Sequence, residues 1–116
     1  MNEKPVQVLL IEDNPGDAHL IRAMISEINL ASSMAPALAL TWCNTLQSAL
    51  DTLNRRHADL VLLDLTLPDS TGLVTLARVQ TIAPEIPIVV LTGVDDEQLS
   101  LNAVHSGAQD YLVKGQ

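Results

Sequence analysis

Phenylalanine is missing from this sequence of 116 residues, and the chain has only one tyrosine and one tryptophan. A hydrophobic core must therefore be built from leucine, isoleucine, valine and alanine. Hydrophobic residues still make up 47% of the chain, as in a folded globular protein. This length has room for a single core, and we predict one domain over residues 1–116.

Positively charged residues are also scarce. Lysine and arginine number 6 against 14 aspartate and glutamate residues, which gives a formal net charge of -8 at pH 7. Nucleic-acid binding needs a basic surface, and anionic membranes attract basic segments. The composition therefore disfavours both nucleic acid and membrane surfaces as partners.

Cys43 is the only cysteine. A single thiol excludes an intrachain disulfide and a metal cluster held by several thiolates. No apolar run approaches the ~20 residues of a membrane span, and the first residues lack the basic-then-apolar order of a secretion signal. We therefore expect a protein of the reducing cytoplasm.

Short apolar runs alternate along the chain with segments of helical spacing. Apolar runs without a period of two indicate strands buried on both faces, as in parallel sheets. Strands that alternate with helices through short connections predict an α/β fold. The predicted strands are Val6–Ile11, Leu38–Trp42, Leu60–Leu63, Ile86–Leu91 and Tyr111–Val113.

Four helices are expected, one after each of the first four strands. Asn14 caps the first helix and Pro15 lies in its first turn. Ser70 or Thr71 is expected to cap the third helix, and Asp95 the fourth. The buried faces of the first three are predicted at Ala18, Ile21, Ile25 and Ile28, at Leu46, Ala49, Leu50 and Leu53, and at Leu73, Leu76 and Ala77.

Polar residues stand directly after four of the predicted strands. In a doubly wound parallel sheet, ligands bind at the carboxyl ends of the strands, where the strand order reverses. The order 2-1-3-4-5 would make the first and third strands neighbours. It would bring together the strand-end residues Glu12, Asp13, Asp64, Thr92 and Lys114.

Three carboxylates at one place need compensating charge. Two like charges about 4 Å apart repel by about 4 kcal/mol at an effective dielectric constant near 20. One lysine does not balance three acids, whereas Mg²⁺ prefers oxygen ligands and usually acts beside a phosphate. The residues therefore predict a Mg²⁺-dependent phosphoryl-transfer site, in which Asp64 would be the nucleophile.

Four motifs surround these residues: "LLIEDNPGD", "LVLLDLTLPDSTG", "IPIVVLTG" and "GAQDYLVKG". In this order and spacing, they make the sequence resemble the receiver domain of two-component response regulators over essentially its whole length. The resemblance implies a flavodoxin-like, CheY-like fold. It also implies that Asp64 accepts a phosphoryl group from a histidine kinase or a histidine phosphotransfer protein, and that the domain switches a covalently linked or separate output domain.

The resemblance assigns a metal site to the first two of these motifs. Asp13, Asp64 and the backbone carbonyl of Thr66 would bind Mg²⁺, with Glu12 assisting. Taken alone, Glu12 and Asp13 could be a solvated turn before a helix, and Asp64 could cap the loop that follows it.

The resemblance assigns the switch to the other two motifs. Thr92 would bond a phosphoryl oxygen, Lys114 would pair with the phosphoryl group or with Asp64, and Tyr111 would be the aromatic residue that turns inward on activation. Taken alone, Thr92 is a common residue at a strand end, Lys114 a common surface residue and Tyr111 a common core residue.

The sequence departs from the family at its end. Gly115 follows Lys114, where the family usually has a proline after a cis peptide bond. A non-proline cis bond costs about 2.5–4 kcal/mol, so a trans bond is expected here. Gln116 stands where the family continues into a fifth helix. We therefore expect a piece of a longer protein, whose open apolar face is covered by another chain, for example in a homodimer, or causes aggregation.

Three other interpretations stay open. A phosphatase of the haloacid-dehalogenase type also forms an aspartyl phosphate, but it would need an aspartate at the position of Thr66. A pseudo-receiver would bind partners without phosphorylation, and Gly115 leaves room for that interpretation. A flavin-binding protein would need a phosphate loop after the first strand and more aromatic residues than this chain has.

Overall fold

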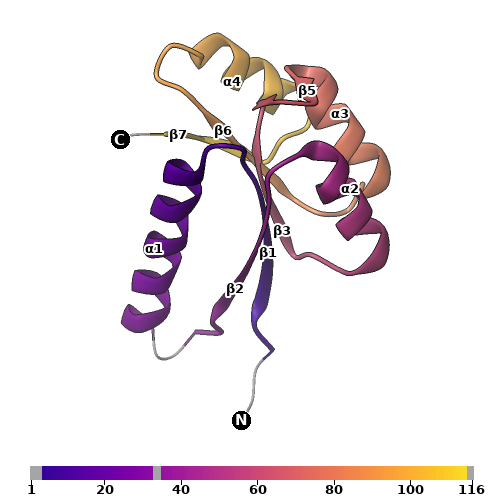
Figure 1. Cartoon of the computed structure of the whole chain (residues 1–116). Coiled ribbons are helices and arrows are strands. Elements are labelled where there is room, and N and C mark those ends of the chain that lie inside the picture. The colour runs from indigo at the N-terminus through magenta and orange to yellow at the C-terminus, as the bar shows by residue number, and fades with distance from the viewer. Residues whose placement is uncertain (1–3, 33–34, 115–116) are drawn as a thin grey trace.

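The computed structural model describes residues 4–32 and 35–114. In this part of the chain, five strands form a sheet, two short strands form a separate hairpin, and four helices surround the sheet (Figure 1). The strands of the sheet are β1 (Val6–Ile11), β2 (Leu38–Cys43), β3 (Leu60–Asp64), β6 (Ile88–Thr92) and β7 (Asp110–Val113). The hairpin is β4 (Thr66–Leu67) with β5 (Ser70–Thr71), and the helices are α1 (Pro15–Ala31), α2 (Leu46–Arg55), α3 (Leu73–Ile82) and α4 (Glu97–His105).

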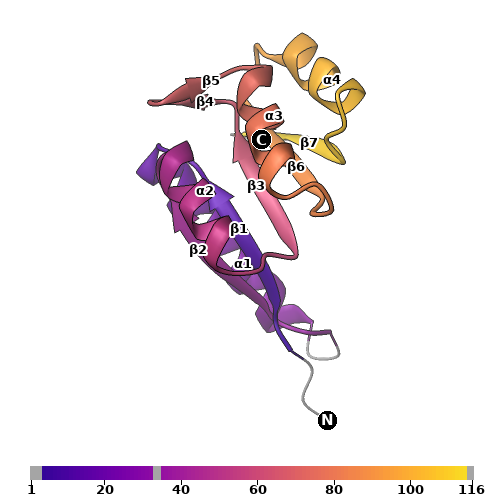
Figure 2. The same cartoon turned by 90° about the vertical axis from the view of Figure 1, so that its right-hand side faces the viewer.

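The sheet has the order β2-β1-β3-β6-β7, and every pair of neighbours is parallel. Because the hairpin lies outside the sheet, this is the predicted order 2-1-3-4-5, and the doubly wound α/β fold is confirmed. Helix α1 covers one face of the sheet, while α2 and α3 cover the other (Figures 1 and 2). The order of winding reverses between β1 and β3, which is where such sheets bind ligands.

Two hydrophobic clusters lie on the two faces of the sheet. Successive residues of a strand point to opposite faces, and β1 shows this directly. Leu9 and Ile11 pack in the cluster that contains α2 and α3 residues, whereas Val8 and Leu10 pack with Ala18 of α1. Burial on both faces is confirmed for β1, β3 and β6. It is wrong for the edge strands β2 and β7, which are largely half-buried or exposed because they have a neighbour on one side only.

The face covered by α1 is incomplete on its β7 side. A hollow of about 330 Å³ lies between α1 and β7. Its lining includes Leu20 and Met24 of α1 and Leu112 of β7, whose side chains are each about half exposed. Ile28, which the helical spacing placed on the buried face of α1, is also 48% exposed. The described helices thus leave an apolar strip beside α1.

The starts of α3 and α4 differ from the sequence prediction. Ser70 and Thr71 do not cap α3, because their backbone is extended in the hairpin with β4. The residue before α3 is Gly72, whose φ of 76° is in the left-handed region that favours glycine. Helix α4 begins after Asp96 instead of Asp95, and no side chain caps it. Ala77 is also exposed, so the predicted buried face of α3 was partly wrong.

Two capping interactions hold the loops at the carboxyl end of the sheet. Asn14 caps α1 as predicted, and its side-chain oxygen accepts the backbone N–H of Asp17 at 3.1 Å. Asp69, from the β4–β5 turn, accepts the backbone N–H groups of Leu46 and Gln47 at 2.9 Å each. The hairpin that follows Asp64 is therefore tied to the first turn of α2.

None of the described helices combines the length and the hydrophobicity that a membrane span requires.

Candidate functional site

The carboxyl ends of the strands bring the predicted site residues together. Glu12 and Asp13 follow β1, Asp64 ends β3, Thr92 ends β6 and Lys114 follows β7. Strand β3 lies between β1 and β6 in the sheet, so Asp64 is at the centre of the group. The parallel register places its neighbours at the same height, since Leu63 pairs with Ile11 and Asp64 with Leu91.

Three carboxylates meet at this edge of the sheet. Glu12, Asp13 and Asp64 each have an oxygen within 4.8 Å of the others. Glu12 is fully buried and Asp64 is 4% exposed, whereas Asp13 is exposed. Two carboxyl groups of the cluster are thus shielded from water and one faces solvent, which leaves a route for an ion to enter.

Lys114 is the cation that reaches this cluster. Its Nζ lies 2.9 Å from Asp64 Oδ2, 3.1 Å from Glu12 Oε1 and 3.1 Å from Asp17 Oδ2. Burial opposes the charge on Lys114, but its carboxylate partners outweigh that effect and raise the pKa of the ammonium above its ordinary value. Asp13 also belongs to the cluster, so one lysine is surrounded by four acidic residues. The site therefore keeps an excess of negative charge.

Glu12 shows what this excess does to a buried carboxyl group. Burial, together with the adjacent Asp64, raises the pKa of Glu12 to about 7. The backbone N–H of Asn14, which donates to Glu12 Oε2 at 3.2 Å, and the ammonium of Lys114 act in the opposite direction without cancelling the rise. A further cation at this position would favour the charged form and lower the pKa again.

The oxygen atoms of the cluster suit Mg²⁺. This ion binds carboxylate oxygens at about 2.0–2.1 Å, so two of its ligand atoms lie no more than about 4.2 Å apart. The observed limit of 4.8 Å is close to that value, and a small side-chain shift would close the difference. The Thr66 carbonyl was also predicted as a ligand. The structure shows its N–H donating to Asp64 Oδ1 at 2.8 Å, and the ligand role of its carbonyl stays a prediction.

The two residues predicted for the switch differ in their surroundings. Thr92 is 3% exposed, and its Oγ1 lies 2.8 Å from the hydroxyl oxygen of Ser100 in α4. Tyr111 is half-buried in β7 and packs against the cluster on the side of α2 and α3. The Lys114–Gly115 bond, predicted to be trans, lies outside the described residues.

Two polar residues of the site were missed from the sequence. Asp17, which contacts Lys114, is the acidic residue in the first turn of α1, and that position just after the strand end was a signal for it. Ser100 is fully buried in α4 beside Thr92. Its only sequence signal was a small polar residue three positions before Ala103, on the buried face of the helix.

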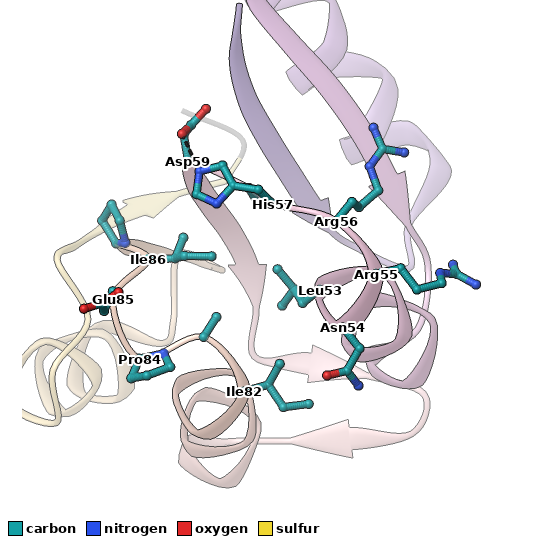
Figure 3. Close-up of a pocket in the computed structure, with 13 residues that line it drawn as sticks. Leu53, Asn54, Arg55, Arg56, His57, Asp59, Ile82, Pro84, Glu85 and Ile86 are labelled. Atoms are coloured by element: carbon teal, nitrogen blue, oxygen red, sulfur yellow. Dashed lines mark hydrogen bonds and ion pairs between the residues drawn. The ribbon is translucent and has the colours of Figure 1, made fainter.

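A further hollow lies elsewhere in the described residues. It has a volume of about 620 Å³ and lies between the end of α2 and the loop from α3 to β6, at the amino ends of the strands. Figure 3 shows Leu53, Ile82 and Ile86 along it, while the side chains of Arg55 and Arg56 point away. His57 Nε2 and Asp59 Oδ1 lie 2.7 Å apart at this hollow, while Glu12, Asp13 and Asp64 gather at the opposite end of the sheet.

The sequence also matches the family model of the response regulator receiver domain over residues 8–116. The chain belongs to this family. It is 32% identical over 105 residues to the regulatory protein LuxO of Vibrio cholerae, a match that covers 90% of this chain and 21% of LuxO. It is 36% identical over 109 residues to the swarming motility regulation protein RssB of Serratia marcescens, a match that covers 94% of this chain and 46% of RssB. The receiver domain therefore spans from about a fifth to about half of the length of these relatives.

Solved structures agree with this assignment. The receiver domain of NtrX from Brucella abortus has a TM-score of 0.71 at 27% identity, with 94% of this chain and 86% of that chain covered. A two-component response regulator from Clostridium difficile has a TM-score of 0.79 at 22% identity, with 96% and 84% covered. At that lower identity the likeness supports the fold alone. The predicted family and fold are both confirmed.

Proposed function

We propose that this receiver domain accepts a phosphoryl group on Asp64 from a phosphohistidine of a histidine kinase or phosphotransfer protein. The observation that supports this proposal is the environment of the Asp64 carboxylate. Lys114 Nζ lies 2.9 Å from Oδ2, and the Thr66 N–H donates to Oδ1 at 2.8 Å. Both donors can stabilise negative charge as it moves onto and around the phosphoryl group.

The proposed transfer is a displacement at phosphorus. One carboxylate oxygen of Asp64 forms a bond to phosphorus while the phosphorus–nitrogen bond of the phosphohistidine breaks. The imidazole leaves with the electron pair of that bond and takes up a proton. Lys114 then follows the added charge, since it already lies between Asp64 and Glu12. The role is regulatory, because the domain modifies itself rather than turning over a separate substrate.

Mg²⁺ is the proposed cofactor of this transfer. Glu12, Asp13, Asp64 and the Thr66 carbonyl are the residues that would hold it, and the ion would supply positive charge to the phosphoryl oxygens. Without the ion, burial and the neighbouring Asp64 raise the pKa of Glu12, so this carboxyl group holds a proton more readily. The three carboxylates of Glu12, Asp13 and Asp64, each with an oxygen within 4.8 Å of the others, support this proposal.

The proposed output is a change at the face formed by α4 and β7. A dianion on Asp64 would draw the Thr92 hydroxyl toward it, and Tyr111 would follow into the space that Thr92 leaves. Such a switch shifts an equilibrium between two states that both exist beforehand. An output domain, linked or separate, would read the shifted face in the cytoplasm, without nucleic acid or membrane contacting this domain.

A second copy of the chain is the proposed cover of the strip beside α1. Leu20, Met24 and Leu112 are each about half exposed around one hollow. Exposed contiguous apolar surface of this kind commonly marks an interface.

Phosphorylation of the purified domain by a small acyl phosphate tests the proposal. With Mg²⁺ present, intact mass is expected to show one phosphoryl adduct, which disappears in Asp64→Asn. The matched control is Asp51→Asn, an exposed aspartate of α2, and it should be modified like the unaltered protein. Absence of any adduct would favour a phosphorylation-independent pseudo-receiver, and repeated turnover of phosphate esters would favour a phosphatase.

A further inference from the structure

Asp69 joins two parts of the fold from the tip of the β4–β5 hairpin. The hairpin projects from the end of β3 and lies outside the five-stranded sheet (Figure 2). Asp69 lies in the turn between β4 and β5, and its two carboxylate oxygens accept the backbone N–H groups of Leu46 and Gln47 at 2.9 Å each. These bonds span 23 and 22 positions of the chain, so they attach the hairpin to α2 rather than to its own neighbours.

The start of α2 is itself attached to the Glu12 side of the site. Strand β2 ends at Cys43, whose carbonyl oxygen accepts the backbone N–H of Glu12 at 3.0 Å. Trp42 Nε1 donates to the backbone carbonyl of Glu12 at 2.6 Å. Helix α2 begins at Leu46, shortly after Cys43. Asp69 therefore connects the end of β3, through the hairpin, to the ends of β1 and β2.

The base of the hairpin holds a hydrogen-bond donor against Asp64. Thr66 is the first residue of β4 and pairs with Thr71 of β5, and its backbone N–H donates to Asp64 Oδ1 at 2.8 Å. A rotation of the hairpin about this base would move the N–H away from the oxygen. The buried Leu67 also holds the hairpin, but apolar packing is non-directional, whereas hydrogen bonds fix an angle.

We propose that Asp69 is a positioning residue, which holds the Thr66 N–H on Asp64 and thereby keeps that carboxylate oriented for phosphoryl transfer. This inference rests on the proposed function. A carboxylate at the start of a helix is also favoured by the helix dipole. A net hydrogen bond changes an equilibrium by about twofold to tenfold. Loss of both bonds should therefore make opening of the hairpin about four to one hundred times more frequent.

Amide hydrogen exchange, followed by NMR in chelator, tests this arrangement without metal or phosphate. Asp69→Ala should speed exchange of the Thr66 amide by about four to one hundred times. Asp69→Asn keeps one acceptor oxygen, so it should give a smaller increase in the same direction. This second variant also serves if the alanine variant does not fold.

Thr45→Ala is the matched control, because it weakens the same helix end without changing the hairpin. Thr45 Oγ1 accepts the backbone N–H of Ser48 at 3.1 Å. The control should speed exchange of the Ser48 amide and leave the Thr66 amide unchanged. Equal acceleration of the Thr66 amide in Thr45→Ala and Asp69→Ala would mean that Asp69 only stabilises α2, and would overturn the inference. Unchanged exchange of the Thr66 amide in Asp69→Ala would overturn it as well.

The rate of phosphoryl uptake supplies the functional measurement. With an acyl phosphate and saturating Mg²⁺, the rate constant for adduct formation on Asp64 should fall by about twofold to tenfold in Asp69→Ala, because orientation contributes to the rate. It should stay unchanged in Thr45→Ala. An unaltered rate in Asp69→Ala would show that Asp69 does not position Asp64. If the unaltered protein forms no adduct while the Thr66 amide responds as expected, the proposed function fails and Asp69 still sets the position of the hairpin.

Discussion

Lys114 Nζ and Asp64 Oδ2 lie 2.9 Å apart although 50 positions separate them in the chain. The contact joins the last described residue after β7 to the end of the central strand β3. The same ammonium also reaches Glu12, whose side chain is fully buried. The Lys114 side chain therefore links residues at the ends of three strands, β1, β3 and β7. Its removal should lower the stability of the domain as well as affect its function.

Lys114→Met should lower the free energy of unfolding at pH 7 without metal by about 1–3 kcal/mol. Removing one partner of a fully buried ion pair costs about 3–5 kcal/mol, but the Lys114 side chain is 22% exposed, so solvent screens part of the loss. Urea unfolding followed by circular dichroism measures the change. Lys4→Met, at an exposed lysine, is the matched control and should have little effect. Equal stability of the two variants would contradict the bridging role of Lys114.

In metal-free protein, the contribution of Glu12 to stability should fall as the pH rises from about 4.5 to about 7. The pKa of Glu12 is near 4.5 when unperturbed and about 7 in the fold. Between these two pH values, folded Glu12 binds its proton more tightly than Glu12 in the unfolded chain. The stabilisation from this proton is therefore complete below pH 4.5 and is lost as the pH rises toward 7. One such group contributes a slope of up to about 1.4 kcal/mol per pH unit.

Glu12→Gln isolates that slope. The difference between the variant and the unaltered protein, measured in chelator at several pH values, should carry the predicted dependence. Glu27→Gln, at an exposed glutamate of α1, should follow the unaltered protein at every pH. A Glu12→Gln variant with the unaltered slope would show that Glu12 does not titrate in this range.

The clustering of the strand-end residues could be predicted from the sequence. Parallel strands have their carboxyl ends at the same edge of the sheet, so any strand order with β1 next to β3 brings these residues together. The partners of those residues could not be predicted in this way. Asp17 and Ser100 occupy helix positions whose contacts depend on how α1 and α4 pack against the sheet. The start of α3 was predicted wrongly because Ser70 and Thr71 are good caps by residue type, yet backbone pairing with β4 takes precedence over that preference.

Trp42 should report Mg²⁺ binding through its fluorescence. It is the only tryptophan, and its Nε1 donates to the backbone carbonyl of Glu12 at 2.6 Å, immediately before Asp13. An ion at the three carboxylates would move that carbonyl or change its field. Titration with MgCl₂ should give a saturable change, which NaCl at equal ionic strength should not reproduce.

Asp13→Asn should lower the Mg²⁺ affinity measured by that titration by roughly tenfold or more. Loss of one unit charge beside a divalent ion costs at least about 1–2 kcal/mol even in a well-solvated place. Asp13 is exposed, so the variant should be at least as stable as the unaltered protein when no metal is present, because one negative charge leaves the cluster. Asp51→Asn should keep the unaltered affinity. If Asp13→Asn and the unaltered protein bind Mg²⁺ equally, Asp13 is not a ligand.

The strip beside α1 should drive self-association. Leu112 is 53% exposed in β7, and Met24 faces the same hollow from α1. Leu112→Glu would place a charge in the proposed interface, where desolvation makes it unfavourable. Light scattering at high concentration should therefore show a lower mean mass for this variant. Val74→Glu replaces a residue of α3 that is 64% exposed and should leave the association unchanged, because α3 is on the opposite face of the sheet. A monodisperse monomer of the unaltered protein at the highest concentration would rule out a second copy as the cover of this strip.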